Sequence, residues 1–171
     1  DDLIATNQRR IALLEDAARR LYREWFVHLR FPGHESVPVR DGVPEGWRAA
    51  PLDEALVLQR GFDLPSGDRV AGDIPIVAST GINGFHNVAK VIGPGVVTGR
   101  SGTLGTVHYV PQDFWPLNTS LWVKEFRAVS PQLAYFILSD LHLEQLNSGA
   151  SVPTLDRKVA HQLPVLIPVA A

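Results

Sequence analysis

The protein has 171 residues, of which 45% are hydrophobic, no cysteine, and a formal net charge of −2 at pH 7. The missing cysteine excludes disulfides and thiolate metal sites and fits a reducing compartment, and the near-neutral charge argues against an indiscriminate binder of polyanions. No apolar run approaches the roughly 20 residues that cross a bilayer, so no membrane partner is expected. The opening residues DDLIATNQRR lack the basic and apolar regions of a secretory signal, and the missing initiator methionine fits a fragment or a processed chain.

Residues 2–29 are predicted to form one long helix, because apolar or small residues recur there at spacings of three and four. A helix of this length spans about 40 Å. Its broad apolar stripe predicts contact with another helix of the same complex, and packing on its own domain is the alternative. Asn7 lies on the seam, where a polar side chain can fix the register of paired helices. The predicted helix interface consists of Ile4, Asn7, Ile11, Leu14, Ala18, Leu21 and Trp25.

Pro32-Gly33 is predicted to end this helix. Residues 31–46 hold three prolines and three glycines, which predicts a linker with a preferred extended course. The globular part is expected to begin near Trp47 and to run to residue 171.

The globular part is predicted to be rich in short strands. PLDEALVLQRG (51–61) indicates a short helix or a strand, and IPIVAS (74–79) indicates a buried strand. Asn83-Gly84 predicts a tight hairpin turn. Further strand candidates are KVI, GVVT, TVHYV and SLWV.

Two helices are expected near the C-terminus. Ser130 followed by Pro131 predicts an N-cap and a first helical turn, with the helix continuing through QLAYFILSDLHLEQL. After a second small polar loop, SGASVPT, Thr154 is predicted to cap a short helix, LDRKVAHQ. LPVLIPV then forms a strand or an apolar tail. The predicted fold class is therefore α+β, a long N-terminal helix followed by a β-rich domain with a few short helices.

A glycine-rich loop precedes the strand TVHYV. Gly99, Gly102 and Gly105 follow a GxxGxxG spacing, which is neither the dinucleotide-binding nor the phosphate-loop pattern. Glycines let the backbone take positive φ, and exposed N–H groups in such a loop can bind an anion. The pattern fits either a tight turn in a β-rich core or a ligand-facing loop.

Five segments occur in a fixed order along nearly the whole chain: NQRRIALLEDAARRLYREWFVHLRFPG, PEGW, STGINGFHN, GRSGTLGTVHY with FWPLNTSLWV, and NSGASVPTLDR with LPVLIP. Together they resemble the specificity subunit of type I restriction-modification systems. The resemblance implies a spacer or coiled-coil helix (1–30), a linker (31–46) and a target recognition domain (47–171).

The resemblance also implies function. Such a chain would read half of a split target on double-stranded DNA and dock methyltransferase subunits, and through the complex the endonuclease. S-adenosylmethionine, ATP and Mg²⁺ are then expected on partner subunits, with no cofactor in this chain, in the cytoplasm of a prokaryote. A full subunit has a second recognition domain and a second helix, so this chain is a fragment, a half-subunit, or a half-length protein that pairs with a second copy.

DNA reading requires groups that hold phosphates and groups that pair with base edges. Each candidate, taken singly, is more often a solvated surface group. The candidates for phosphate or guanine are Arg60, Arg69, Lys90, Arg100, Arg157 and Lys158. The candidates for base edges are Gln59, Asn83, His86 and Asn87, and Ser101 and Thr103 would help to hold a phosphate at the glycine loop.

No catalytic role is expected. The sequence lacks an amino-methylation motif and a nuclease constellation, and its six histidines lack metal-ligand spacing. Two other function classes remain open. One is a helical oligomerisation or scaffold module without DNA specificity, and the other is an enzyme that uses the glycine loop on a phosphorylated small molecule.

Overall fold

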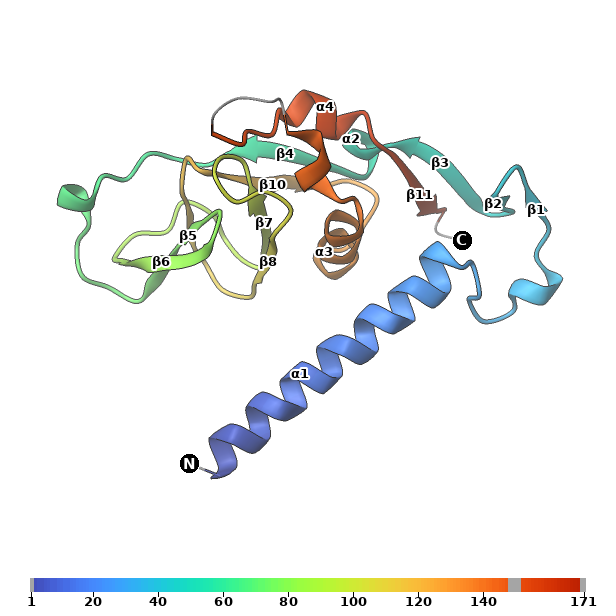
Figure 1. Ribbon diagram of the computed structural model, residues 1–171, viewed down its shortest axis with the longest axis horizontal. Helices are drawn as coiled ribbons and strands as arrows, with labels where there is room; N and C mark the ends of the chain where they lie inside the picture. The colour runs from blue at the N-terminus through green and yellow to red at the C-terminus, as the bar shows by residue number, and fades with distance from the viewer. Residues whose placement is uncertain (1, 148–151, 170–171) are drawn as a thin grey trace. The chain divides into compact units, whose positions relative to one another are not determined.

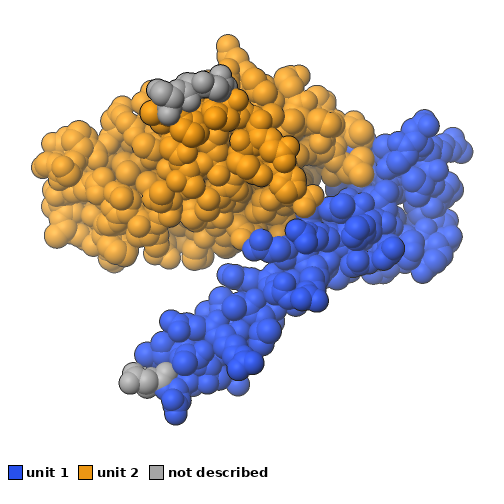
Figure 2. Space-filling view, in the orientation of Figure 1, with its two compact units in different colours: residues 1–48, 168–171 blue, residues 49–167 orange. Residues whose placement is uncertain are grey.

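The computed structural model of the protein describes residues 2–147 and 152–169. The chain divides into two compact units, residues 1–48 with 168–171 and residues 49–167, which Figure 2 draws in different colours. Within the described residues, no helix combines the length and the apolar character that spanning a membrane requires.

The first unit begins with α1 (Asp2–Tyr22), which continues into a π-helical turn, η1 (Arg23–Val27). Arg19 and Arg20 lie in the last turn of α1, where positive charge complements the helix dipole. The predicted helix is confirmed as far as residue 27, but its end is two residues early. The backbone N–H of His28 donates to the carbonyl of Arg23 at 2.8 Å, and Leu29 then takes a positive φ of 58° that stops the helix before Pro32-Gly33.

Aromatic side chains explain this early end. The ring of Phe26 lies 5.2 Å from that of Tyr22 and 5.2 Å from that of Trp47. The ring of Phe31, which follows the end of η1, stacks on the ring of Trp47 at a centroid distance of 5.2 Å. Aromatic pairs at these separations contribute roughly 0.5–1.5 kcal/mol each beyond their buried area, so they hold the chain in a turn after η1.

The segment 31–46 is not a simple extended linker. It contains the short helix η2 (His34–Ser36) and a hairpin of β1 (Val39–Arg40) with β2 (Val43–Pro44). Asp41 and Gly42 at its tip have φ values of 52° and 78°, the pair of positive angles that a type I′ turn requires.

The second unit contains two main sheets (Figure 1). The larger has the order β4 (Leu56–Arg60), β10 (Ser120–Phe126), β7 (Gly95–Gly99), β8 (Val107–Val110), with antiparallel pairs throughout. The smaller has the order β6 (Gly81–His86), β5 (Ile74–Ala78), β9 (Trp115–Pro116), and β5 and β9 are parallel. β3 (Trp47–Pro51) pairs with β11 (Pro164–Pro168), which confirms a strand for LPVLIPV.

The remaining helices are short. α2 (Leu52–Ala55) precedes β4, so PLDEALVLQRG holds both a helical turn and a strand. η3 (Ser66–Asp68) lies in the polar loop before β5. α3 (Pro131–Asp140) packs on β7 and β8 and buries Ala134, Ile137 and Leu138.

Strand β5 organises the core because it is buried on both faces, as the sequence predicted. Ile76 and Ala78 pack with Leu64, Trp115 and Leu117. Val77, which points the other way, packs with a second cluster, Val91, Val97, Val110 and Phe114. Phe62 contacts both clusters and joins them.

Helix boundaries near the C-terminus differ from the sequence prediction. Ser130 is the N-cap, as predicted, and its Oγ accepts from the Leu133 N–H at 3.2 Å. The helix ends at Asp140, because His142 takes a left-handed φ of 50° before the separate 3₁₀ helix η4 (Leu143–Leu146). The cap of α4 (Arg157–His161) is Asp156 and not Thr154, since the Asp156 carboxylate accepts from the Lys158 N–H at 2.8 Å.

The predicted hairpin turn at Asn83-Gly84 is wrong. The turn between β5 and β6 lies at Ser79 and Thr80, and Asn83-Gly84 lies inside β6. There the register shifts, so that Asn83 and Gly84 together face the single residue Ile76 between the pairs Pro75↔Phe85 and Val77↔Ile82. Gly84 has a φ of 111°, and the dipeptide therefore forms a β-bulge.

Candidate nucleic-acid interface

The glycine loop is closed by hydrogen bonds within the protein. The N–H groups of Arg100 and Ser101 both donate to the Thr119 carbonyl, at 2.9 and 3.0 Å. The N–H of Gly102 donates to the Pro153 carbonyl at 3.0 Å. Three successive donors are thus already used, so of the two alternatives the structure favours a tight turn over an anion-binding nest built from these amides.

The same hydrogen bonds place a distant segment beside the loop. Ser101 and Thr154 form an antiparallel bridge, and the Leu155 N–H donates to the Arg100 carbonyl at 2.9 Å. Leu155 is buried and anchors this segment. Of the preceding polar loop, residues 148–151 lie outside the described part of the chain.

Three of the arginines predicted to contact DNA converge through this pairing. Arg60 ends β4 and faces Leu121 of β10, Arg100 follows β7, and Arg157 begins α4. They line a cleft of about 450 Å³ that we call the arginine cleft. Its lining is Arg60, Arg100, Leu121, Thr154, Leu155, Asp156 and Arg157.

The arginine cleft carries an excess of positive charge. Asp156 is the one carboxylate in its lining, and that group caps α4. Arg60 Nη2 lies 3.7 Å from the carboxylate of Asp63 outside the cleft, which also accepts from Asn118, so part of the Arg60 charge is compensated. Arg100 Nη1 donates a long hydrogen bond of 3.4 Å to the Asn118 carbonyl. Guanidinium groups that face a cleft in this way suit phosphate or guanine as ligands.

A half-buried histidine at the end of α4 ties this helix to β4. His161 Nε2 accepts from the Leu58 N–H at 2.9 Å. Burial lowers the pKa of His161 from its ordinary value of 6.5, and the charges of Arg157 and Arg127 lower it further, against the opposite effect of Asp53. The ring is therefore neutral at pH 7 and keeps its acceptor, which fixes α4 and with it Arg157.

Two further predicted residues form a pair at the β6 bulge. Arg69 Nη1 donates to the Asn83 carbonyl at 2.9 Å and to the Asn83 Oδ1 at 3.2 Å. Asn83 is exposed. The two residues are 14 positions apart, and no pattern in the sequence indicates that they pair.

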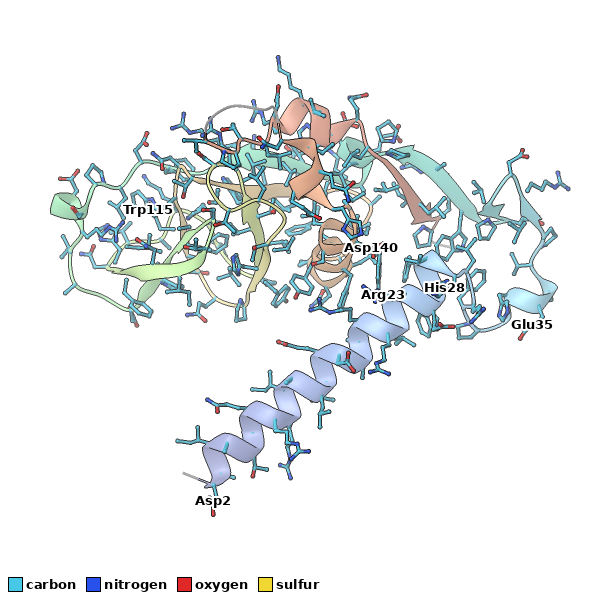
Figure 3. The ribbon with its side chains drawn as sticks, viewed as in Figure 1. Asp2, Arg23, His28, Glu35, Trp115 and Asp140 are labelled. Atoms are coloured by element: carbon cyan, nitrogen blue, oxygen red, sulfur yellow. The ribbon has the colours of Figure 1, made fainter. Side chains whose placement is uncertain are left out.

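His86 is buried in the module, whereas Lys90 is exposed. His86 is only 6% exposed, and its Nδ1 accepts from the Val70 N–H at 3.0 Å. Its ring lies 5.2 Å from that of Trp115, which Figure 3 labels within the second unit. Lys90 Nζ lies 5.0 Å from the Trp115 ring centroid and 5.9 Å from that of Phe62, as a cation–π contact. His86 therefore supports the core, and Lys90 lies on the surface over these aromatic rings.

The other candidates do not join the arginine cleft. Gln59 lies on β4 opposite Trp122, and Asn87 is exposed after β6. Ser101 is partly covered by its bridge to Thr154, while Thr103 and Lys158 are exposed. Within the described ranges, no three His, Asp or Glu side chains gather as a metal site would need.

The helix-interface candidates lie along an uncovered face of α1. None of the described residues of α1 is buried. Ile4, Ile11, Leu14 and Leu21 are 48–70% exposed, and Leu3 and Leu13 widen the apolar surface. Asn7 is exposed, and Ala18 and Trp25 are partly covered. Figure 3 draws the side chains of this helix, with Asp2 labelled at its start and His28 after its end.

Comparison of the sequence with models of protein families and with curated proteins finds no match. Comparison with solved structures finds ten similar chains, among them the following three. The first is the S subunit of a type I restriction-modification system from M. genitalium, with 13% identity, a TM-score of 0.63, and coverage of 77% of this chain and 36% of that one.

The second chain comes from a structure concerning the complex assembly and conformational transition of a type I restriction-modification system. It has 13% identity and a TM-score of 0.59 over 98% of this chain and 45% of that chain. The third is the HsdS subunit from Thermoanaerobacter tengcongensis, with 13% identity and a TM-score of 0.58 over 98% of this chain and 44% of that chain. The protein thus spans less than half the length of each of these subunits. It has the fold of a type I restriction-modification specificity subunit, a long helix followed by a strand-rich module with a few short helices.

Proposed function

We propose that this chain is a DNA-recognition subunit of a type I restriction-modification complex, that it reads one half of a split target, and that it performs no reaction itself. The convergence of Arg60, Arg100 and Arg157 at one cleft, on a fold shared with specificity subunits, is the observation that carries the proposal. Arginine holds phosphates and pairs with guanine, which are the two tasks that sequence reading requires.

In this proposal the two units have separate tasks. The module of residues 49–167 contacts double-stranded DNA, and the apolar face of α1 docks a methyltransferase subunit or the helix of a second S chain. The endonuclease joins through the assembled complex. S-adenosylmethionine, ATP and Mg²⁺ act on those partner subunits.

Methylation mapping tests the proposal. Cells carry this chain with the methyltransferase subunit of its own system, and every methylated position in the genome is recorded. We expect one defined sequence whose methylation disappears when this chain is deleted. Methylation without a defined sequence, or an unchanged pattern after deletion, would refute the proposal.

A binding experiment with purified subunits complements the mapping. The assembled complex should prefer the mapped duplex over a scrambled duplex of equal length, whereas the chain alone should bind both weakly. The isolated chain has a net charge of −2 and releases few counterions from DNA. Equal affinity of the complex for both duplexes would contradict the proposed role.

A further inference from the structure

Strand β6 has a surface that its place in the fold does not explain. It is an edge strand, and all four residues Ile82 to Phe85 are exposed. Ile82 is 65% exposed and Phe85 is 51% exposed. Proteins usually protect an edge strand with charge or proline, and an uncovered apolar edge marks a contact surface.

The bulge determines which side chains this surface presents. Two residues, Asn83 and Gly84, occupy the space of one opposite Ile76, and the positive φ of Gly84 absorbs the extra residue. Without the bulge, the alternation of a regular strand would turn every second side chain from Ile82 to Phe85 inward. With the bulge, Ile82 opposite Val77 and Phe85 opposite Pro75 lie on one face of the sheet, whereas Asn83 lies opposite Ile76 on the other face, and all three residues are exposed.

Arg69 fixes the orientation of the Asn83 amide. Its Nη1 donates to both the carbonyl and the Oδ1 of Asn83, so the amide oxygen faces Arg69 and the amide nitrogen is left for another partner. His86 holds Arg69 in place, because its ring accepts from the N–H of the next residue, Val70. An ordered amide of this kind keeps one free acceptor lone pair and two donors.

Adenine matches these groups. In the major groove adenine offers its N7 as an acceptor and its N6 amino group as a donor, and asparagine pairs with both at once. Residues 82–85 of the edge strand β6 are exposed and therefore open to such a ligand.

We propose that Asn83 reads one adenine of the target in the major groove and that Arg69 is its positioning residue. This inference rests on the proposed function, since it assigns the base-reading element of the same module. Phosphates are held elsewhere, at the arginine cleft.

The experiment compares methylated sequences for complexes built with full-length variants. Asn83→Asp keeps the shape but replaces the donor that adenine N7 needs, and it should relax the preference for adenine at one position by roughly ten- to hundredfold. Arg69→Met should relax the same position, and Arg69→Lys should restore part of the preference. Gln145→Ala, which removes an exposed amide on η4, is the matched control and should leave the sequence unchanged.

A second measurement uses the unmodified protein. Replacing each adenine of the target in turn by 7-deazaadenine removes the N7 acceptor, and one position should lose roughly tenfold in affinity for the wild-type complex and nothing for the Asn83→Asp complex. An unchanged methylated sequence for the Asn83→Asp complex would overturn the inference. An Asn83→Asp complex that melts at the wild-type temperature but loses affinity equally for every sequence would overturn it as well. Neither result touches the proposed function, which is tested separately on the wild-type complex and on cells that lack this chain.

Discussion

Removing the positive charge of the arginine cleft should weaken DNA binding in a way that depends on salt but not on sequence. The variant carries Arg60→Gln, Arg100→Gln and Arg157→Gln, which keep much of the length and polarity of each side chain. Each phosphate contact contributes about 0.9 to the slope of log affinity against log salt concentration. Arg100 and Arg157 should each contribute fully, whereas Arg60 shares its charge with Asp63 at 3.7 Å.

The slope for the assembled complex should therefore fall by about 1.8 to 2.7. Between about 50 and 200 mM salt, the wild-type complex should lose about 10- to 40-fold more affinity than the variant complex. Fluorescence anisotropy with a labelled target duplex at four salt concentrations measures both slopes. Lys124→Gln, an exposed charge on β10 outside the cleft, is the control. Equal slopes for the triple variant and the wild type would refute the assignment of phosphates to the cleft.

Three other variants test separate parts of the structure. Ile11→Asp combined with Leu14→Asp should abolish association with the methyltransferase or a second copy, measured as mass in solution. Gly99→Ala should destabilise the module by about 1–3 kcal/mol in urea unfolding, because the added methyl group meets the Thr103 carbonyl. His161→Gln keeps an acceptor but cannot be protonated. Since the folded state depresses the pKa of His161, wild-type stability should fall, relative to the variant, as the pH drops below about 6.5.

For each of these three variants, one contrary result would contradict the expectation. Undiminished association would mean that the α1 face is not the docking surface. A fully stable alanine variant would mean that the glycine loop can rearrange at no cost. Parallel stability curves for the wild type and His161→Gln between pH 5 and 7.5 would show that the neutral histidine does not hold α4 to β4, and that the nearby Asp53 and Asp156 dominate the acid response.

The helix and the buried strand could be predicted because their signals are local. Spacings of three and four along residues 2–27 give a single apolar stripe, and the unbroken apolar run from 74 to 78 predicts a strand buried on both faces. The end of the helix could not be found in this way. It is set by the contact of Phe26 and Phe31 with Trp47, which lies 16 or more residues away in the sequence.

Two glycine dipeptides show where turn signals fail. Asp41-Gly42 forms a hairpin turn that the proline-rich context concealed, with positive φ at both residues. Asn83-Gly84 has the stronger turn signal, yet only Gly84 has a positive φ, and the pair forms a bulge within β6. The choice between turn and bulge depends on how β6 registers with β5, and short-range propensity carries no information about that register.

The arginine cleft could be predicted only as separate residues. Arg60, Arg100 and Arg157 are far apart in the sequence, and each alone resembles a solvated surface charge. Their convergence depends on the pairing of the glycine loop with residues 153–155. His86 illustrates the opposite case, since a histidine beside Asn87 in a polar segment suggests an exposed base contact, whereas β6 turns its ring into the module.

The charge of the chain constrains how it can take part in DNA recognition. With a net charge of −2, the protein cannot derive much affinity from the general attraction of phosphates. A cleft of three arginines and an ordered asparagine can still distinguish sequences, because discrimination depends on a few well-placed groups. In the proposed complex, strong binding would then come from partner subunits that are held near the same duplex. A low intrinsic affinity has an advantage in such an assembly, since a module that bound every duplex tightly would occupy the many wrong sites before it reached the right one.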